Sequence, residues 1–300
     1  MANLTLKQLR YMDALARHGH FGRAAEACAI SQPALSVQIK ELEESLGLAL
    51  FERGPREVRL TGFGEEFLTR ARDILQGTDE LLDLARASKD RLAGRLRIGI
   101  IPTIAPYLLP QLIGRLNQSH AGLDLHVRET LTPRLLRDLS EGRIDTAIVA
   151  LPVSEPAFTE VPLAEESFVL VRPAQDAAKP VPSGEDLRRM RLLLLEEGHC
   201  FRDQALAFCN TPQSLPKDGL EGSSLSTLVQ MVGAGIGVTL IPDMAVKVET
   251  RSANVAVARF PDPQPRRTLG MIWRRASPLA PQLRQIAEVV RAALHDTQAA

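Results

Sequence analysis

Short apolar runs alternate with helical stretches from Arg95 to the end of the chain. Such alternation is typical of an α/β fold, in which helices pack on a mostly parallel sheet. This pattern covers about two thirds of the chain and therefore constrains the fold more than any other feature. The expected strands are 96–101, 123–128, 144–150, 167–171, 192–195, 237–241 and 269–273, and the expected helices include 106–117, 133–140, 225–234 and 281–294.

Length and charge restrict the class of protein. A chain of 300 residues is long enough for two or more domains. Its formal net charge of zero excludes a generally basic nucleic-acid coat protein, so any nucleic-acid contact must come from a local patch. The N-terminus lacks the pattern of a signal peptide, and no apolar run reaches transmembrane length. We therefore expect a cytoplasmic protein with no membrane partner.

The first sixty residues predict three short helices followed by a β-hairpin. Ser31 is a good N-cap for the third helix, whose apolar face leaves amide, hydroxyl and ammonium groups on the opposite face. Two helices joined by a tight turn, followed by an arginine-bearing hairpin, are typical of winged helix-turn-helix DNA readers. Each feature alone also fits an ordinary solvated surface, but their order favours DNA binding. The apolar stripe expected on the first helix comprises Leu4, Leu6, Leu9, Tyr11, Met12 and Leu15.

A long helix is expected next, capped by Thr61 and running to about residue 89. Apolar and small residues recur along it at alternating spacings of four and three, which is the pattern of a coiled-coil seam. We expect this helix to dimerise two chains. A dimer carries two DNA-binding domains, which suits a pseudo-palindromic DNA site. The seam residues are Phe67, Ala71, Ile74, Thr78, Leu81, Ala85 and Ser88.

Two of the three cysteines stand at the two ends of one short amphipathic helix. Cys200 stands at its start beside His199 and Arg202, where positive neighbours and the helix N-terminus favour the thiolate. Cys209 lies near the apolar face, where burial would raise its pKa. Nine residues of helix separate the two α-carbons by about 13 Å, whereas a disulfide tolerates about 4.4–6.8 Å. A disulfide would therefore require the helix to unwind, which describes a redox switch; two buried cysteines acting as small hydrophobes are the plainer alternative. Three cysteines without close spacing predict no metal site.

The N-terminal motifs resemble those of the LysR-type transcriptional regulators. They are Phe21-x-x-Ala24-Ala25, Ser31-Gln32-Pro33-Ala34-Leu35-Ser36, Gln38-Ile39, Leu42-Glu43, Leu46-Gly47, Leu50-Phe51-Glu52-Arg53 and Leu60-Thr61-x-x-Gly64. The resemblance implies that the third helix contacts bases through Gln32, Pro33, Ser36 and Lys40, and that Arg53 and Arg56 contact the DNA backbone. It also implies a DNA-binding domain at 1–61, a linker helix at 62–92 and a regulatory domain at 93–300. That domain would have two lobes, about 93–163 plus 268–300 and 164–267, with crossovers near Leu163 and Arg267 and a cleft as in periplasmic binding proteins.

Within that family, the regulatory region is similar to the hydrogen-peroxide sensors. The shared segments are Ile101-Pro102-Thr103, Pro106-Tyr107-Leu108-Leu109-Pro110, Leu194 to Cys200, Arg202-Asp203-Gln204-Ala205, Phe208-Cys209 and Pro265-Arg266-Arg267-Thr268. This similarity implies that Cys200 is the peroxidatic thiol and Cys209 the resolving thiol. His199, Arg202 and Asp203 would shape the pocket, and Thr103 and Thr132 would position peroxide through their hydroxyls.

The function implied is transcriptional activation in response to peroxide, through a reversible Cys200–Cys209 disulfide and without a cofactor. RNA polymerase, a second chain in a homodimer or homotetramer, and glutaredoxin or thioredoxin as reductant are the implied partners. One alternative is a LysR-type regulator that binds a metabolite. A thiol peroxidase and a periplasmic solute binder are two more, but neither explains the DNA reader, and we expect no enzyme.

Overall fold

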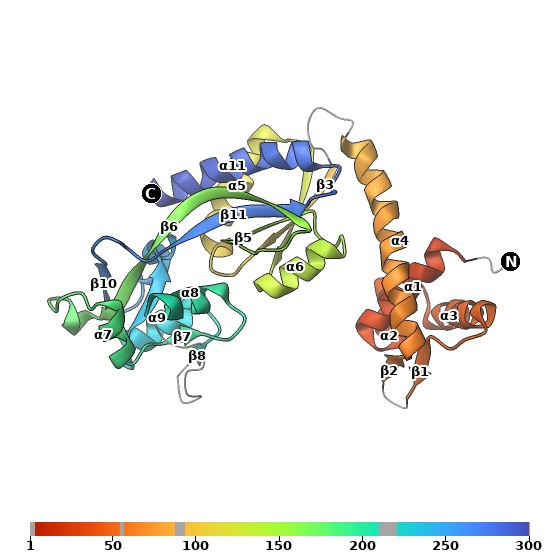
Figure 1. The fold of residues 1–300 in the computed structure, drawn as a ribbon, viewed down its shortest axis with the longest axis horizontal. Coiled ribbons are helices and arrows are strands. Elements are labelled where there is room, and N and C mark those ends of the chain that lie inside the picture. Colours follow the sequence, from red (N-terminus) through yellow and green to blue (C-terminus); the bar gives the residue numbers. More distant parts are fainter. Residues whose placement is uncertain (1–3, 55–56, 88–93, 210–220, 300) are drawn as a thin grey trace. The chain divides into compact units, whose positions relative to one another are not determined.

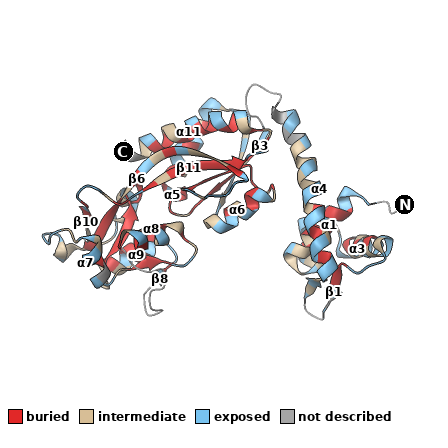
Figure 2. Cartoon of the chain, viewed as in Figure 1, coloured by how far each residue is buried: buried red, intermediate tan, exposed pale blue. Residues whose placement is uncertain are grey.

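The computed structural model describes residues 4–54, 57–87, 94–209 and 221–299. The chain divides into two compact units, Met1–Ala85 and Arg86–Ala300 (Figure 1). Each unit buries its own apolar core, which Figure 2 shows as separate groups of buried residues. No helix among the described residues is both long and apolar enough to span a membrane.

The first unit contains the three helices and the hairpin that the sequence predicts. Ser31 caps the third helix, with its Oγ accepting from the Ala34 amide at 3.4 Å. Glu43 on that helix accepts from the amides of Leu50 and Phe51, which fixes the hairpin against the helix. In order, the elements are α1 (Leu6–His18), α2 (Phe21–Ala27), α3 (Gln32–Leu46), β1 (Phe51–Arg53), β2 (Val58–Leu60) and α4 (Gly62–Ala87).

The apolar stripe predicted for α1 is wrong at its start. Leu4 and Leu6 are 40% and 43% exposed, because Thr5 is the N-cap and the helix begins only at Leu6. Met12 and Leu15 are fully buried, so the stripe is correct farther along the helix. The buried face of α1 therefore starts at Gln8 and Leu9, and it includes Asp13 as well as apolar side chains.

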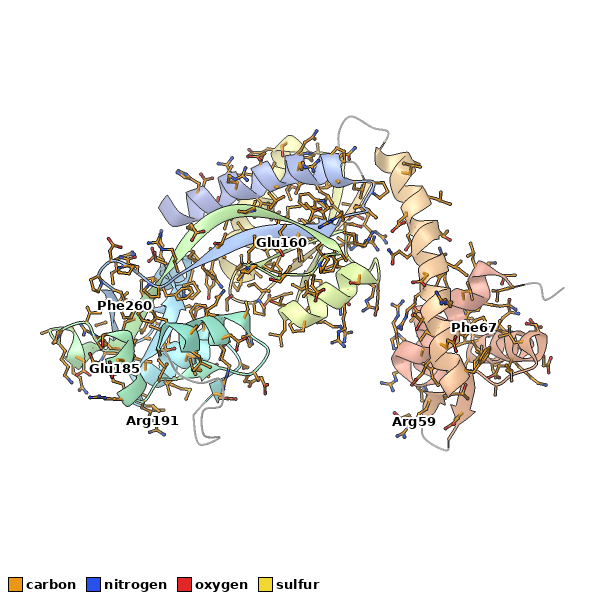
Figure 3. The ribbon with its side chains drawn as sticks, in the orientation of Figure 1. Arg59, Phe67, Glu160, Glu185, Arg191 and Phe260 are labelled. Carbon is orange, nitrogen blue, oxygen red and sulfur yellow. The ribbon has the colours of Figure 1, made fainter. Side chains whose placement is uncertain are left out.

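The long helix α4 begins where the sequence predicts, because the Thr61 hydroxyl accepts from the Gly64 amide at 2.9 Å. Its first turns belong to the core of the unit, and Leu68 and Ala71 are buried there. Farther along, Ile74 and Leu81 are 48% and 68% exposed. Figure 3 labels Phe67 on α4 and Arg59 on β2.

The second unit is an α/β structure with one seven-stranded sheet in the order β10-β6-β11-β5-β3-β4, with β9 also paired to β6. We call the part around β3, β4, β5 and β11 the first lobe and the part around β7 to β10 the second lobe. The first lobe contains β3 (Gly94–Ile100), α5 (Ala105–Ser119), β4 (Leu123–Glu129), α6 (Thr132–Ser140), β5 (Thr146–Leu151), β11 (Arg266–Arg274) and α11 (Ala280–Ala299). The second contains η1 (Ala174–Asp176), α7 (Gly184–Arg189), β7 (Leu194–Leu195), α8 (Cys200–Phe208), β8 (Glu221–Gly222), α9 (Leu225–Gly233), β9 (Thr239–Pro242), η2 (Asp243–Ala245), α10 (Val246–Glu249) and β10 (Val255–Arg259).

Strand β6 (Phe158–Pro173) belongs to both lobes. Residues 158–167 pair with β11, and residues 168–173 pair with β9 and β10 (Figure 1). The sequence predicts only the second half of this strand, because the first half contains Pro162 and several glutamates. The strand nevertheless forms there, since every residue but one finds a partner on β11.

The expectation of a mostly parallel sheet is wrong. β3 pairs in parallel with β4 and β5, but β11 is antiparallel to both of its neighbours, and β9 and β10 are antiparallel to β6. The physical reason is that β6 and β11 connect the lobes in opposite directions. Apolar periodicity predicts a strand but not the direction of its neighbours.

Candidate functional site

Helix α8 begins at Cys200 and ends at Phe208, so the predicted helix between the two cysteines is confirmed. Gly198 has a φ of +96°, a conformation that suits glycine, and an added Cβ would lie 3.1 Å from Leu131. This turn leads through the N-cap residue His199 into the helix. Cys200 therefore sits where the backbone amides of a helix N-terminus are unpaired and favour negative charge.

A narrow cavity lies against Cys200, and its lining side chains are packed so closely that a water-sized molecule fits only if they move. It has no room for a metabolite-sized ligand, since metabolite pockets typically measure about 300–1,000 Å³. Four of the predicted site residues meet there: Thr103, Thr132, His199 and Cys200. The first two come from the first lobe and the last two from the second. The remaining lining residues are Ile101, Pro102, Leu131, Gly198 and Phe201.

The two threonine hydroxyls in this cavity differ in their partners. Thr103 is 3% exposed, and its Oγ1 accepts a hydrogen bond of 2.8 Å from Arg267 Nη1. A guanidinium can only donate, so the single hydroxyl proton of Thr103 remains available for another acceptor. The Oγ1 of Thr132 is buried and has no hydrogen-bond partner among the described residues. Buried polar groups are normally paired, so an unpaired hydroxyl beside a cysteine indicates a place for a polar ligand.

His199 is 8% exposed and faces the same cavity. Burial lowers the pKa of its imidazole, and the nearby Glu196 carboxylate only partly opposes this effect. The ring is therefore neutral near pH 7. The sequence predicts a positive neighbour for Cys200 at this position, whereas the structure provides a neutral hydrogen-bonding group.

Arg202 and Asp203 do not line the cavity. Arg202 Nη1 donates to the Leu195 carbonyl at 2.8 Å and to Glu221 Oε1 at 2.6 Å, and so fastens α8 to β7 and β8. Asp203 is exposed on the helix surface. Arg202 stands two helical positions after Cys200, about 200° around the helix, so its side chain points away from that sulfur.

Arg267 is the residue that sequence reasoning missed as part of the site. It is 3% exposed, contacts Thr103, donates from Nε to Glu166 Oε2 at 2.7 Å, and lies 5.5 Å from the centre of the Phe201 ring. From the sequence, Arg267 marks only the family resemblance and the crossover between the lobes. Its signal is a charged residue at the start of an otherwise apolar strand, which is too common to identify a site without the fold.

Cys209 is fully buried at the C-cap of α8, where its amide donates to the Ala205 carbonyl at 3.2 Å. Burial raises the pKa of its thiol to about 11, as the sequence predicts, so it is protonated at neutral pH. Backbone packs closely at this end: a Cβ on Gly184 would lie 2.5 Å from the Phe208 carbonyl oxygen. Neither Cys200 nor Cys209 is in a disulfide, and the continuous helix holds them apart.

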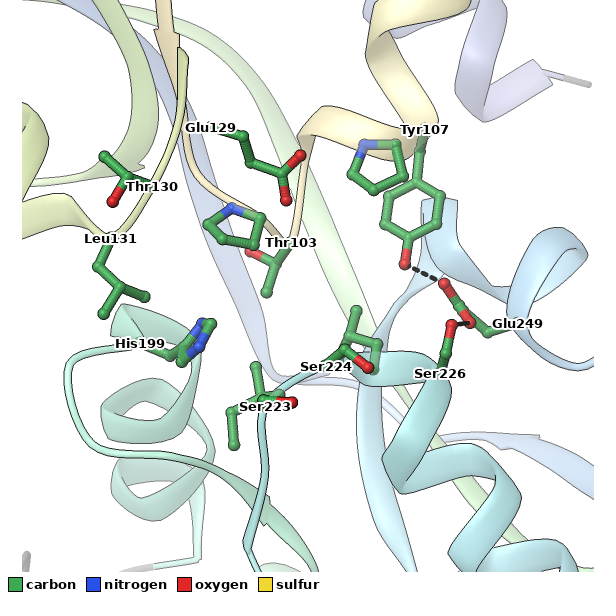
Figure 4. Close-up of a pocket in the computed structure, with 14 residues that line it drawn as sticks. Thr103, Tyr107, Glu129, Thr130, Leu131, His199, Ser223, Ser224, Ser226 and Glu249 are labelled. Carbon is green, nitrogen blue, oxygen red and sulfur yellow. Dashed lines mark hydrogen bonds between the residues drawn. The ribbon is translucent and has the colours of Figure 1, made fainter.

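A larger pocket of about 360 Å³ lies between the lobes (Figure 4). It shares Thr103, Leu131 and His199 with the small cavity. At its far side, Tyr107 of the first lobe donates to Glu249 Oε1 of the second lobe at 2.6 Å, and Ser226 donates to the other oxygen of the same carboxylate.

Of the predicted DNA-contacting residues, Gln32, Pro33, Ser36 and Lys40 lie on α3, and Arg53 ends β1. Gln32, Pro33 and Lys40 are exposed and Ser36 is half-buried, while Lys40 lies 3.4 Å from Glu44. The side chain of Arg53, and Arg56 as a whole, fall outside the described residues. Exposed polar groups on the second helix of a helix-turn-helix are the features that read the major groove.

A helix-turn-helix unit joined to a two-lobed α/β unit defines a class of transcriptional regulators. Residues 6–65 match the bacterial regulatory helix-turn-helix protein, lysR family, and residues 89–295 match the LysR substrate binding domain. The chain belongs to the LysR family.

Its relatives include OxyR proteins. The DNA-binding transcriptional dual regulator OxyR of Escherichia coli K12 is 40% identical over 96% of this chain and 95% of its own length. A probable hydrogen peroxide-inducible genes activator from Streptomyces viridosporus is 42% identical over 97% and 95%. A full-length OxyR variant from Pseudomonas aeruginosa has a TM-score of 0.75 and 38% identity, covering 96% and 95% of the chains. Oxidized OxyR of Corynebacterium glutamicum has a TM-score of 0.62 and 35% identity, covering 98% and 93%.

Proposed function

We propose that this regulator senses hydrogen peroxide through a reversible disulfide between Cys200 and Cys209 and activates transcription when oxidised. The observation that carries the proposal is the pair of environments at the ends of α8. Cys200 faces a narrow hydroxyl-lined cavity at the start of the helix, and Cys209 is buried and protonated at its C-terminal end. The names of the OxyR relatives support the same conclusion.

The chemistry proceeds in two balanced steps. The Cys200 thiolate attacks one peroxide oxygen, the O–O bond breaks, and the sulfur becomes a sulfenic acid while hydroxide leaves and is protonated to water. Hydroxyl donors such as Thr103 and Thr132 stabilise the charge that develops on the leaving oxygen. The Cys209 thiol then condenses with the sulfenic acid to give a disulfide and a second water.

The second step requires α8 to unwind. Removing Cys209 from its buried site costs on the order of 2–3 kcal/mol of apolar contact, which the covalent bond offsets. The oxidised segment therefore settles into a different packing, and this rearrangement is the signal.

The first unit converts this signal into regulation. Gln32, Pro33, Ser36 and Lys40 contact bases of an operator, and Arg53 and Arg56 contact its backbone. The exposed apolar residues of α4, such as Leu81, pair two chains into a homodimer that can assemble further into a homotetramer. We place the reader at 1–61, the linker at 62–92 and the regulatory domain at 93–300.

Two further partners follow from the proposal. RNA polymerase receives the signal at the promoter, and glutaredoxin or thioredoxin reduces the disulfide. The protein acts in the cytoplasm as a switch and not as an enzyme, because each oxidation event is stored as a disulfide until a reductant resets it.

Mapping of the peroxide-induced crosslink tests the proposal. The reduced full-length protein is treated with hydrogen peroxide, digested without reductant and examined by mass spectrometry, and its DNA footprint is recorded in parallel. We expect a Cys200–Cys209 peptide pair and an altered footprint, both absent in Cys200→Ser and both present in Cys28→Ser. A Cys200→Ser protein that still responds to peroxide would contradict the proposal.

A metabolite-binding regulator is the second candidate, because the pocket between the lobes falls within the usual size range for metabolite sites. It predicts a footprint change that depends on a cellular small-molecule extract freed of peroxide by catalase. It also predicts that the change persists in Cys200→Ser.

A further inference from the structure

A buried ion pair lies behind the cavity of Cys200. Glu166 and Arg267 are direct partners in the register of β6 and β11, and they are 2% and 3% exposed. Arg267 donates to Glu166 Oε2 from Nε, and its Nη2 lies 2.7 Å from the same oxygen. The other carboxylate oxygen accepts from the Met244 amide at 3.2 Å. Neither side chain lines the cavity, so peroxide does not touch them.

Arg267 links this pair to the reacting centre. One edge of its guanidinium faces Glu166, and the other donates to Thr103 through two bonds, Nη1 to Oγ1 at 2.8 Å and Nη2 to the carbonyl at 3.1 Å. The plane of the group also lies against Phe201, the residue after Cys200. A planar guanidinium with acceptors on both edges has a single orientation.

That orientation decides what the Thr103 hydroxyl can do. Because its oxygen accepts from a cation, its proton is free to donate into the cavity, and the positive charge makes it a stronger donor. If the guanidinium turned away, the same hydroxyl would instead donate to a nearby carbonyl or rotate freely. A donor that must reorient during the reaction stabilises the leaving oxygen less than one already aimed at it.

We infer that Glu166 is a positioning residue for the peroxide reaction: it fixes Arg267, which holds the Thr103 hydroxyl as a donor to the oxygen that leaves. This inference rests on the proposed function and adds a residue that acts only through others. It predicts that Glu166 affects the reaction of Cys200 with peroxide but not its reactivity toward reagents that need no hydroxyl donor.

Two rates measured on the full-length reduced protein test the inference. The first is the second-order rate of Cys200 sulfenic acid formation with hydrogen peroxide, followed by dimedone trapping and mass spectrometry. The second is the rate of Cys200 alkylation by iodoacetamide, which reports the availability of the thiolate. The variant is Glu166→Gln. The matched control is Glu165→Gln, because Glu165 is the exposed neighbour whose carboxylate accepts from Thr268.

We expect Glu166→Gln to slow the peroxide reaction at least tenfold, since loss of one positioned donor typically costs about 10²–10³-fold and repositioning loses part of that. Alkylation should change less than twofold, and Glu165→Gln should match the wild type in both rates. In a Thr103→Val background, Glu166→Gln should slow the reaction no further. A wild-type peroxide rate in Glu166→Gln, or equal changes in both rates, would overturn the inference.

Glu166→Asp covers the case in which the glutamine variant does not fold. It retains the charge but shortens the side chain, so we expect a peroxide rate between those of wild type and Thr103→Val, and a folded variant with the wild-type rate would refute the positioning role. Failure of the proposed function looks different: wild-type Cys200 itself would not react with peroxide faster than a free thiol.

Discussion

The two ends of α8 carry the same side chain in opposite surroundings. Cys200 lies at the helix N-terminus, half-buried, beside one oriented hydroxyl and one unpaired hydroxyl. Cys209 lies at the C-cap, fully buried, with a pKa raised by the absence of solvent. The comparison shows that one short helix can hold two thiols in environments as different as the proposed peroxidatic and resolving roles require. The difference holds only while the helix is wound.

The two ends also differ in what holds them. Near the first, Arg202 fastens α8 to β7 and β8 through a carbonyl and a carboxylate. At the second, Gly184 packs against the Phe208 carbonyl, and the rings of Phe208 and Phe260 meet at 5.0 Å. A polar clamp near Cys200 and apolar packing near Cys209 predict distinct consequences of mutation, which follow from the largest effect to the smallest.

Thr103→Val should affect the reaction of Cys200 with peroxide but not the packing around Cys209. Removing a donor aimed at the leaving oxygen is expected to slow sulfenic acid formation about 100-fold, measured by stopped-flow with hydrogen peroxide. Thr130→Val is the control, because Thr130 lines the larger pocket and not the small cavity. Equal rates in the two variants would show that the oriented hydroxyl has no role.

Gly184→Ala should affect the packing around Cys209 but not the reaction at Cys200. The new Cβ would lie 2.5 Å from the Phe208 carbonyl, and such overpacking costs about 1–3 kcal/mol. We expect lower stability of the reduced protein in urea and faster alkylation of Cys209, with little change at Cys200. Gly114→Ala serves as the control because nothing lies within 4 Å of its added Cβ; a stability equal to that control would refute the close packing.

Arg202→Met tests whether Arg202 only attaches α8 to β7 and β8 or also takes part in the reaction at Cys200. Loss of hydrogen bonds from a charged group is expected to cost about 1–2 kcal/mol of reduced-state stability, while the peroxide rate changes less than threefold because Arg202 does not line the cavity. Arg189→Met removes an exposed pair with Glu185 and should cost little. A large loss of peroxide rate in Arg202→Met would place this residue at the reacting centre after all.

The pH dependence of stability should report Cys209. Its folded pKa of about 11 lies above the unfolded value, so the unfolded chain loses the proton first and stability falls as pH rises through this window. We expect a loss of about 1.5–2 kcal/mol by pH 10 from this thiol, measured as the difference between wild type and Cys209→Ala in urea titrations. Parallel pH profiles for the two proteins would show that the thiol is not buried in the reduced state.

Local sequence signals predicted the elements that depend on neighbours in sequence. Caps at Ser31 and Thr61 and the helical period after Cys200 correctly placed α3, α4 and α8. The antiparallel course of β6 and β11 was not predicted, because strand direction depends on partners far along the chain. Short elements such as β10 and α7 were also missed, since they carry too few residues for a period.

The site residues show the same difference between what depends on neighbours in sequence and what depends on distant partners. Thr103, Thr132, His199 and Cys200 meet as the family resemblance implies. The family resemblance, together with closeness in sequence to Cys200, places Arg202 in the pocket, whereas the structure turns it toward Glu221. Arg267 was missed because its partners, Thr103 and Glu166, are 164 and 101 residues away. Such contacts exist only after β6 and β11 have paired.

Hydrogen exchange across α8 tests the central claim most directly. Amide exchange of the peptide spanning residues 200–209 is compared by mass spectrometry between the reduced protein and the peroxide-treated protein. We expect slow exchange in the reduced state and loss of protection throughout the segment once the two sulfurs are joined, with no change in Cys200→Ser. Retained protection in a protein proven to carry the disulfide would contradict the view that α8 must unwind for peroxide to be sensed.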